Sequence, residues 1–348
     1  MKRSKKKQRQ LKLSAVETVL QMEGLSSKEY FHLEDTDQGP QRVLMDINLT
    51  VKRSESWGIY GRSAFDIKLL LEIIANIKPY HGGRCVLVEL GMMRSKRVIL
   101  EHVFYIGGST MLYNNMNVLE YLMFATAKQK FDSVYRQESI FEFLINVGLG
   151  HISLTPIRML TKEEKAVITL LAAAYSNSII TVFNVPEYQF NETLSLAIGK
   201  ISKLITKKKN ALILGTKNPF LIENACSHTA YITDGELIYK GLVKDLRLDY
   251  DMILFIIKDK NAADMLQSLA DRLPGHELSI DGDRLLISDR GGAKSDPLQL
   301  YETIIEAGFA PQCIKVNPKT VQNAYEEIGR LHDLQKQLPQ QGAPAGVH

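Results

Sequence analysis

Residues 57–77 read WGIYGRSAFDIKLLLEIIANI, and this stretch decides the fold. Trp57–Gly61 has the pattern of a short buried strand that ends in a glycine turn, and Ile67–Ile77 has the apolar spacing of a helix packed on a sheet. Two later apolar runs, Ile179–Phe183 and Ala211–Leu214, are typical of strands buried on both faces. Because helical stretches alternate with these strands, the sequence predicts an α/β domain with a mostly parallel sheet.

The pattern restarts near residue 250. Six segments follow there in the order β-α-β-β-α-β, which predicts a ferredoxin-like α+β domain: Met252–Lys258, Ala262–Leu273, Glu277–Ile280, Arg284–Ser288, Leu298–Ala307 and Gln312–Val316. A closing helix is predicted from Thr320.

We therefore divide the chain into four parts. Residues 1–17 are a basic tail, and residues 18–249 are the α/β domain, with a helical subdomain at about 115–160. Residues 250–334 form the accessory domain. Residues 335–348 are rich in Gln, Pro, Gly and Ala, which predicts a disordered tail.

Charge is distributed unevenly. The 348 residues include 43 Lys+Arg and 39 Asp+Glu with 45% hydrophobic residues, a composition that excludes fibrous and wholly disordered classes. The first twelve residues hold no acid, and outside them acids slightly outnumber bases, so no nucleic-acid partner is predicted. The tail has three interpretations: a solvated end, a contact with anionic lipid, or a contact with nucleic acid. Its basic residues are Lys2, Arg3, Lys5, Lys6, Lys7, Arg9 and Lys12.

Several other classes of site have no support in the sequence. The three cysteines are too few and too dispersed for a disulfide framework, which predicts a reducing cytoplasm, and the eight histidines show no ligand spacing, so no metal site is predicted. Glu17 and Glu23 interrupt the apolar stretch that a signal peptide would need. No apolar run approaches the roughly 18 residues of a membrane-spanning helix.

A phosphate-binding loop of the form G-x-x-x-x-G-K-[ST] would lie between the first buried strand and its helix. Gly58 and Gly61 retain two glycines there, with Arg62 after them. Ser63 then replaces the next glycine, Ala64 the lysine and Phe65 the hydroxyl that binds magnesium. In these residues and in the segments downstream, the chain resembles the ATP-binding cassette of ABC transporters. This resemblance implies a P-loop NTPase core.

The resemblance continues at the family's spacing over roughly residues 18 to 330. Gly108 stands at the Q-loop glutamine, and Asn184 and Val185 stand at the magnesium-coordinating aspartate and the water-polarising glutamate of the Walker B strand. Asn191 is at the D-loop aspartate, and Lys217 replaces the switch histidine. The resemblance makes Tyr30 the candidate adenine-stacking aromatic. The signature sequence LSGGQ is matched by Leu160, Thr161, Lys162, Glu163 and Glu164.

These substitutions weaken both halves of a composite ATP site. Losing the lysine removes a charge-assisted contact of about 1.5 to 3 kcal/mol, roughly a tenfold to hundredfold loss of affinity. Asp66 adds a negative charge near the phosphates, and Ser63 hinders backbone approach if its φ is positive. Thr161 could keep a hydroxyl for nucleotide, but Glu163 would face a triphosphate. We expect no catalytic residue intact, no firm cofactor, and ATP bound weakly at most.

The resemblance implies a subunit at the inner face of the cell membrane, partnered by a multi-spanning membrane subunit and a second cassette in a homo- or heterodimer. The accessory domain resembles that of ATPase subunits of drug, polysaccharide and lipid exporters. Three functions stay open: a non-hydrolysing docked subunit, an active divergent ATPase that uses Tyr30, and a soluble regulator. The resemblance also implies a docking groove for the membrane subunit beside the helical region Met116–Tyr121, with Phe124 adding apolar surface; the alternative is that these residues pack inside the helical subdomain. The transported substrate and the direction of transport are left open.

Overall fold

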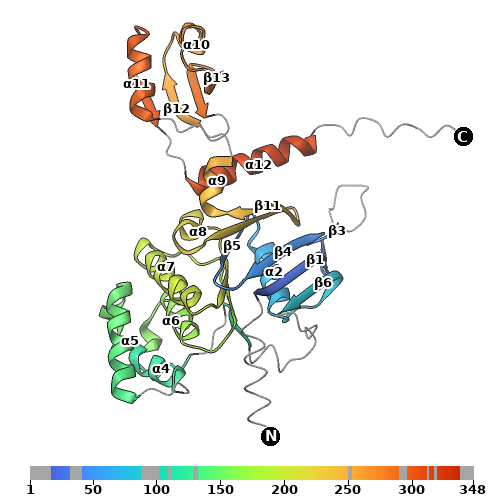
Figure 1. The fold of residues 1–348 in the computed structure, drawn as a ribbon, viewed down its shortest axis with the longest axis vertical. Coiled ribbons are helices and arrows are strands. Elements are labelled where there is room, and N and C mark those ends of the chain that lie inside the picture. Colours follow the sequence, from blue (N-terminus) through green and yellow to red (C-terminus); the bar gives the residue numbers. More distant parts are fainter. Residues whose placement is uncertain are drawn as a thin grey trace, which may run out of the picture. The chain divides into compact units, whose positions relative to one another are not determined.

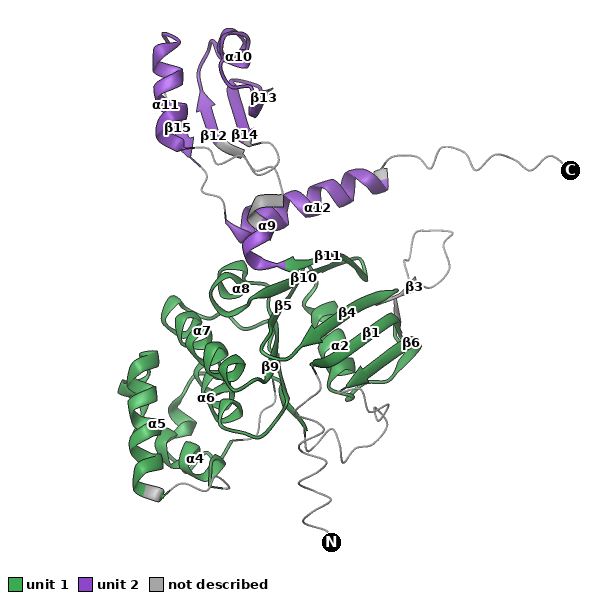
Figure 2. Ribbon diagram, viewed as in Figure 1, with its two compact units in different colours: residues 1–241 green, residues 242–348 purple. Residues whose placement is uncertain are grey.

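The computed structural model describes residues 17–31, 41–87, 102–108, 112–127, 132–249, 253–289, 296–311, 313–316 and 320–337. It forms two compact units, residues 1–241 and 242–348 (Figure 2). Most of the predicted tails, residues 1–16 and 338–348, lies outside the described residues, but the disorder predicted from residue 335 is wrong for residues 335–337, which belong to a helix.

A six-stranded sheet with the order β11-β10-β5-β9-β8-β7 is the centre of the first unit. Five of its strands run parallel, as the sequence predicted: β5 (Ser56–Gly61), β7 (Val103–Ile106), β8 (Ile180–Asn184), β9 (Ala211–Gly215) and β10 (His228–Thr233). β11 (Glu236–Leu242) follows a turn in which Asp234 and Gly235 both have positive φ, the requirement of a tight hairpin.

Each face of this sheet has its own apolar core, because alternate residues of each strand point to opposite sides. One face packs on α2 (Ala64–Ile74) and on an antiparallel sheet of β4 (Ile47–Lys52), β1 (Thr18–Ser27) and β6 (Tyr80–Leu87). The other face packs on α6 (Lys162–Ala174), α7 (Glu192–Lys207) and α8 (Pro219–Ala225), an arrangement that Figure 1 shows. Covering on both faces explains why β8 and β9 are buried along their whole length.

The helical subdomain consists of α4 (Val118–Ala125), α5 (Ser133–Val147) and the short 3-10 turns Gly150–Ile152 and Ile157–Met159. The prediction that this subdomain presents an apolar docking surface is wrong in one respect, because part of the predicted surface is packed in the core. Tyr121 is only 8% exposed and belongs to the core of the unit, and Met116 and Leu119 pack against the same core. Phe124, by contrast, is 53% exposed. Among the residues predicted for docking, Phe124 therefore offers the exposed apolar side chain.

The second unit contains the predicted β-α-β-β-α-β order. Its antiparallel sheet has the order β13-β14-β12-β15, the strand order of a ferredoxin-like fold. The elements are α9 (Val243–Asp249), β12 (Ile253–Lys258), α10 (Ala262–Ala270), β13 (His276–Asp281), β14 (Arg284–Asp289), α11 (Pro297–Glu306), β15 (Cys313–Val316) and α12 (Val321–Gln337).

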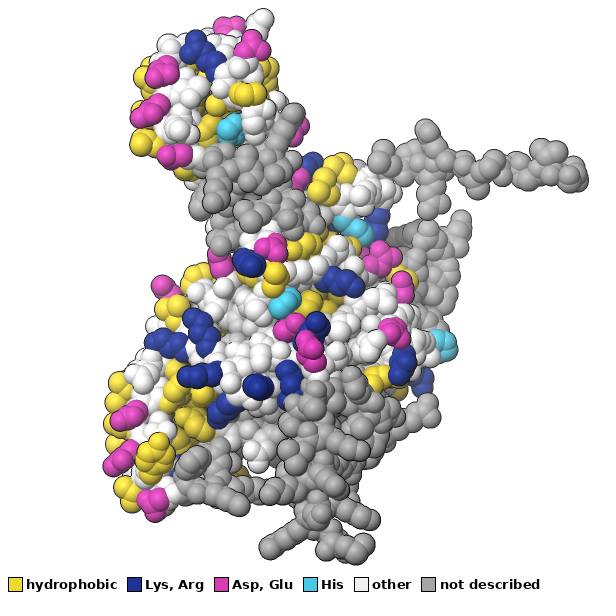
Figure 3. Space-filling model, viewed as in Figure 1, with side chains coloured by type: hydrophobic (Ala, Val, Ile, Leu, Met, Phe, Trp, Pro, Cys, Tyr) yellow, Lys and Arg dark blue, Asp and Glu magenta, His cyan; other side chains and the backbone are white. Residues whose placement is uncertain are grey.

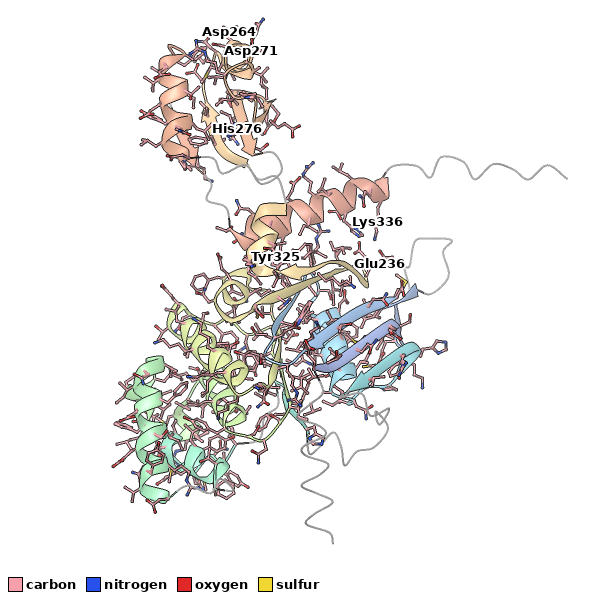
Figure 4. The ribbon with its side chains drawn as sticks, viewed as in Figure 1. Glu236, Asp264, Asp271, His276, Tyr325 and Lys336 are labelled. Atoms are coloured by element: carbon pink, nitrogen blue, oxygen red, sulfur yellow. The ribbon has the colours of Figure 1, made fainter. Side chains whose placement is uncertain are left out.

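The two helices within that order cover one face of the antiparallel sheet. Met265 and Leu269 of α10 are fully buried against Phe255 and Ile287 of the sheet. Asp264 of α10 and Asp271 beyond its end, both labelled in Figure 4, are exposed to solvent, so the helix is amphipathic. Across the described ranges of the chain, no helix is both long enough and apolar enough to span a bilayer.

Candidate functional site

The candidate site is the edge of the six-stranded sheet where the parallel strands end. Gly61 ends β5, Asn184 ends β8, Gly108 follows β7 and Lys217 follows β9. Ligands of open α/β sheets bind at this edge, so the fold brings these four predicted positions together. Tyr30 lies in a separate two-stranded sheet, in which β2 (Tyr30–Phe31) pairs with β3 (Gln41–Arg42).

The connection from β5 to α2 is too short to be a phosphate loop. β5 pairs with β10 as far as Gly61 opposite Ile232, so Gly58 and the residues after it are strand. α2 begins at Ala64, which leaves only Arg62 and Ser63 between strand and helix. A phosphate loop instead needs several backbone N–H groups outside any ladder. Counted from Gly58, the loop pattern therefore falls largely within a strand.

Ser63 caps the helix instead of obstructing a phosphate. Its φ of −96° is ordinary extended backbone, so the conflict predicted from a positive φ does not arise. The Ser63 hydroxyl oxygen accepts a hydrogen bond from the Asp66 N–H at 3.3 Å. Burial raises the pKa of Asp66, while the hydrogen bond with Ser63 lowers it. The Asp66 carboxyl already lies in the first turn of the helix, where the macrodipole favours a negative group.

The strand end suggests a second register for the same pattern. If Gly61 is its first glycine, Asp66 replaces the second glycine, Ile67 the lysine and Lys68 the hydroxyl. Ile67 is fully buried. Its side chain lies so close to Gly61 and Gly215 that a Cβ atom added at either glycine would approach it to 3.2 or 2.7 Å. In both registers an apolar residue, Ala64 or Ile67, stands at the lysine position.

Asn184 is bonded to protein where the family would bind magnesium. Its side chain amide donates to the Lys68 carbonyl oxygen at 3.1 Å and to the Tyr105 hydroxyl at 3.0 Å, which ties β8 to α2 and β7. Asn184 is 3% exposed, and its Oδ1 atom is buried without a hydrogen-bond partner. Val185 is also 3% exposed and has no polar side chain. A carboxylate ligand for magnesium is missing at both positions, so these residues do not fit a magnesium–nucleotide complex.

Tyr188 links the Q-loop position to the signature position. Its hydroxyl donates to the Gly108 carbonyl oxygen at 3.1 Å, and the Lys162 ammonium lies 5.0 Å from the centre of its ring. Burial raises the pKa of the Tyr188 hydroxyl, and the charges of Glu163 and Glu187 raise it further. Neither Tyr105 nor Tyr188 was among the site residues predicted from the sequence. Tyr188 follows the predicted strand Ile179–Phe183 by five residues, whereas no strand was predicted around Tyr105.

The signature-like segment uses its polar groups for its own helix. Thr161 begins α6 with a capping box: its hydroxyl oxygen accepts from the Glu164 N–H at 3.1 Å, and the Glu164 carboxylate accepts from the Thr161 N–H at 2.8 Å. The Thr161 hydroxyl, expected as a possible contact for nucleotide, is used in the cap of its own helix in this structure. Glu163 pairs with Lys162 at 3.7 Å, and Leu160 is buried.

The remaining two positions also have local roles or contacts with solvent. Asn191 caps α7, because its side chain oxygen accepts from the Leu194 N–H at 2.8 Å. Lys217 is exposed, whereas the preceding Thr216 is buried and its N–H bonds to the Ile59 carbonyl oxygen at 3.1 Å.

No family model matches this chain. By sequence it is 25% identical over 214 residues to the Methionine import ATP-binding protein MetN 1 of Oenococcus oeni, covering 60% of this chain and 61% of that protein. It is 24% identical over 221 residues to the Methionine import ATP-binding protein MetN of Clostridium tetani, covering 60% of this chain and 68% of that protein. The chain thus spans about three fifths to two thirds of the length of these relatives.

Solved structures agree with the fold. The chain superposes with a TM-score of 0.52 and 16% identity on the ATP-binding subunit of an ABC transporter, covering 66% of this chain and 92% of that one. It superposes with a TM-score of 0.50 and 16% identity on cbiO1 of Clostridium perfringens, described as part of the ABC transporter complex cbiONQ, covering 74% of this chain and 96% of that one. The predicted ATP-binding cassette fold, an α/β P-loop NTPase core with a mostly parallel sheet, is therefore confirmed.

Proposed function

We propose that the chain is a non-hydrolysing cassette subunit that docks on the membrane subunit of an ABC transporter at its cytoplasmic side. The observation that carries the proposal is the direct connection from β5 to α2, in which strand and helix replace the phosphate loop. Buried Ile67 and the bonded Asn184 amide add to it, because they fill the positions of a lysine and a carboxylate. The role that remains for such a cassette is binding and positioning of partners.

The proposal does not specify export. The two relatives reported above are named as methionine import proteins, so the exporter class has no support among them. The proposed partners are a multi-spanning membrane subunit and a second cassette, either another copy of this chain or a different one. The same docking would make the protein peripheral to the inner face of the membrane.

Nucleotide chemistry tests the first half of the proposal. We expect the purified full chain to release no phosphate from ATP above a protein-free blank and to show no saturable binding of a fluorescent ATP analogue at micromolar concentration. Magnesium-dependent release that co-elutes with the folded chain would overturn it. Loss of that release on Asn184→Ala would assign it to this site and not to a contaminant.

Two sets of substitutions test whether the phosphate-loop pattern is to be counted from Gly58 or from Gly61. Asp66→Gly, Ile67→Lys, Lys68→Ser restores the pattern counted from Gly61, and Ala64→Lys, Phe65→Ser restores it from Gly58. We expect the triple variant to gain ATP-dependent thermal stabilisation and the double variant to gain none, because stabilisation grows with ligand concentration over Kd. The opposite result would place the loop at Gly58.

Co-purification tests docking. From native membranes in mild detergent, we expect recovery with a polytopic membrane protein, reduced by Phe124→Asp. Phe124 and Tyr113 are both exposed, and their rings pack edge to face with their centroids 5.1 Å apart. The matched control is Leu298→Asp, which changes a side chain that is 63% exposed in the second unit. Recovery of the chain alone, with no membrane partner, would favour the soluble regulator.

A further inference from the structure

Two helices of the first unit expose stripes of residues with the same spacing. The stripe on α5 advances by four, three and four positions and consists of Val134, Glu138, Phe141 and Ile145. The stripe on α7 repeats these steps and consists of Leu196, Lys200, Lys203 and Lys207. At 3.6 residues per turn, the members of each stripe fall within roughly 60° around the helix axis, and each stripe is about 16 Å long. Steps of three and four residues are the pattern of a seam between two packed helices.

Both stripes expose apolar side chains. The inner side of α5 supplies Ile140 and Leu144 to the core of the unit. The stripe on its outer side adds three more apolar side chains, which are between 40% and 61% exposed. On α7, Leu196 is 44% exposed. A helix that is apolar on two sides is typical of one whose outer side is covered by a partner.

The two stripes carry opposite charges. Glu142 lies beside Glu138 on the outer side of α5, and neither carboxylate bonds or pairs with another described residue. On α7 the ammonium groups of Lys203 and Lys207 are exposed, and neither bonds or pairs with a described residue. The helix dipole favours a cation at Lys207, in the last turn, but not at Lys203. We therefore call the stripe on α5, with Glu142, the acidic stripe and the stripe on α7 the basic stripe.

The two stripes meet at one point of the surface. The Lys200 ammonium donates to the Asn146 carbonyl oxygen, next to Ile145. A Cβ atom added at Gly148, the C-cap of α5, would lie 3.8 Å from the Thr193 side chain of α7. Figure 1 shows α5 below α7 along one side of the first unit, so the stripes extend from this junction in opposite directions. In Figure 3, yellow and magenta side chains over α5 and dark blue side chains over α7 lie on the same face.

This arrangement is complementary to itself. A two-fold axis through the junction would lay the acidic stripe of one copy along the basic stripe of a second copy, and symmetry would repeat the contact in reverse. The paired helices would run antiparallel, and the equal steps of the stripes would keep their residues opposite one another. Ile145 then meets Leu196 of the second copy, and Glu138 meets Lys203 of the second copy.

We propose that the chain forms a two-fold symmetric dimer through α5 and α7, in which each acidic stripe packs on the basic stripe of the second copy. Packing of either stripe on its own kind would bring carboxylates or lysines together, which opposes association. An anionic bilayer or a nucleic acid would attract the basic stripe but repel the acidic stripe beside it. A second copy covers both stripes.

The dimer goes beyond the proposed function and does not depend on it. It uses neither the strand-end edge around Asn184 nor the exposed Phe124 ring. It also forms without a membrane subunit, so failure of this proposal and failure of docking on a transporter are distinguishable.

Sedimentation velocity over a concentration series measures the oligomeric state of the purified full chain. We expect a monomer–dimer equilibrium that shifts toward monomer near 1 M salt, where the screening length is about 3 Å. One variant is Glu138→Lys, Glu142→Lys, and the other is Lys203→Glu, Lys207→Glu. Each makes stripes of like charge face each other, so each is expected to dimerise on the order of a hundredfold more weakly.

Mixing the two variants separates loss of charge pairing from loss of folding. In the mixed dimer, the introduced lysines face the introduced glutamates, and the unchanged stripes face each other. We expect the equimolar mixture to dimerise like the parent, and a single chain with all four substitutions to do the same.

Two matched controls lie in the second unit. Glu302→Lys, Glu306→Lys changes two exposed acids of α11 at the same helical spacing, and Lys244→Glu, Lys260→Glu changes two exposed lysines. Both are expected to dimerise like the parent. A monomeric parent, a dimer that survives both reversals, or two variants that stay monomeric when mixed would each overturn the proposal. A monomeric parent that sediments with phosphatidylglycerol vesicles would overturn it as well and assign the basic stripe to a membrane.

Discussion

Replacing Asn184 by aspartate tests whether this residue serves to hold β8 to α2 and β7 by hydrogen bonds or is a surviving magnesium-binding position. The Asn184 amide donates two hydrogen bonds, to the Lys68 carbonyl oxygen and to the Tyr105 hydroxyl. In Asn184→Asp the first bond is lost and a carboxylate faces that carbonyl, whereas the Tyr105 hydroxyl can turn and donate. One lost bond and one unpaired buried acceptor together predict a loss of about 2 to 3 kcal/mol in the free energy of unfolding.

The cost of this substitution depends on pH. Burial raises the pKa of the introduced carboxyl in the folded state above its value of about 3.9 in the unfolded chain. As pH rises from about 4, the unfolded state gives up its proton first, so unfolding becomes more favourable until the folded-state pKa is passed. The variant should therefore be more destabilised at neutral pH than at mildly acidic pH.

The assay is urea unfolding followed by tryptophan fluorescence. Trp57 is the only tryptophan of the chain and lies in β5, 6% exposed, so the signal reports the first unit. The control is Tyr105→Phe, which removes one acceptor and should cost about 1 kcal/mol, with the double variant measuring the coupling. A variant as stable as the parent, or one stabilised specifically by magnesium with ATP, would refute the argument that Asn184 serves to join β8 to its neighbours by hydrogen bonds.

Three further outcomes follow from packing and burial. Ile67→Ala should cost about 2 to 5 kcal/mol by urea unfolding, because Ile67 fills the space over Gly61 and Gly215, whereas Ile67→Val should cost about 0.5 to 1.5; equal costs would contradict this. Gly58→Ala should lower the free energy of unfolding by about 1 to 3 kcal/mol, because a Cβ atom would come within 2.9 Å of the Ile222 side chain. Its control is Gly275→Ala, where a Cβ atom would meet nothing within 4 Å, and thermal melts of the two variants should show a loss of stability only for Gly58→Ala. With a maleimide at pH near 8, mass spectrometry should find exposed Cys313 modified and Cys85 unmodified, since burial raises the pKa of the Cys85 thiol to about 12; labelling of Cys85 in the folded chain would contradict this.

Local patterns in the sequence were enough to predict much of the fold. The strand before Gly61, the strands ending at Phe183 and Leu214, and the β-α-β-β-α-β order of the second unit follow from apolar periodicity, which each segment shows by itself. The positions of Asn184 and Gly108 were expected from the resemblance to the ATP-binding cassette, whose motif spacing they match. These predictions needed no knowledge of which side chains meet.

What each side chain does at that edge was decided by the tertiary structure. Hydrogen bonding between β5 and β10 makes Gly58 a strand residue where a phosphate loop was predicted, and packing of α2 on the sheet buries Ile67. The contacts of Asn184 with Lys68 and Tyr105 join residues far apart in the sequence. Such contacts arise only when distant segments pack together, and no local periodicity encodes them.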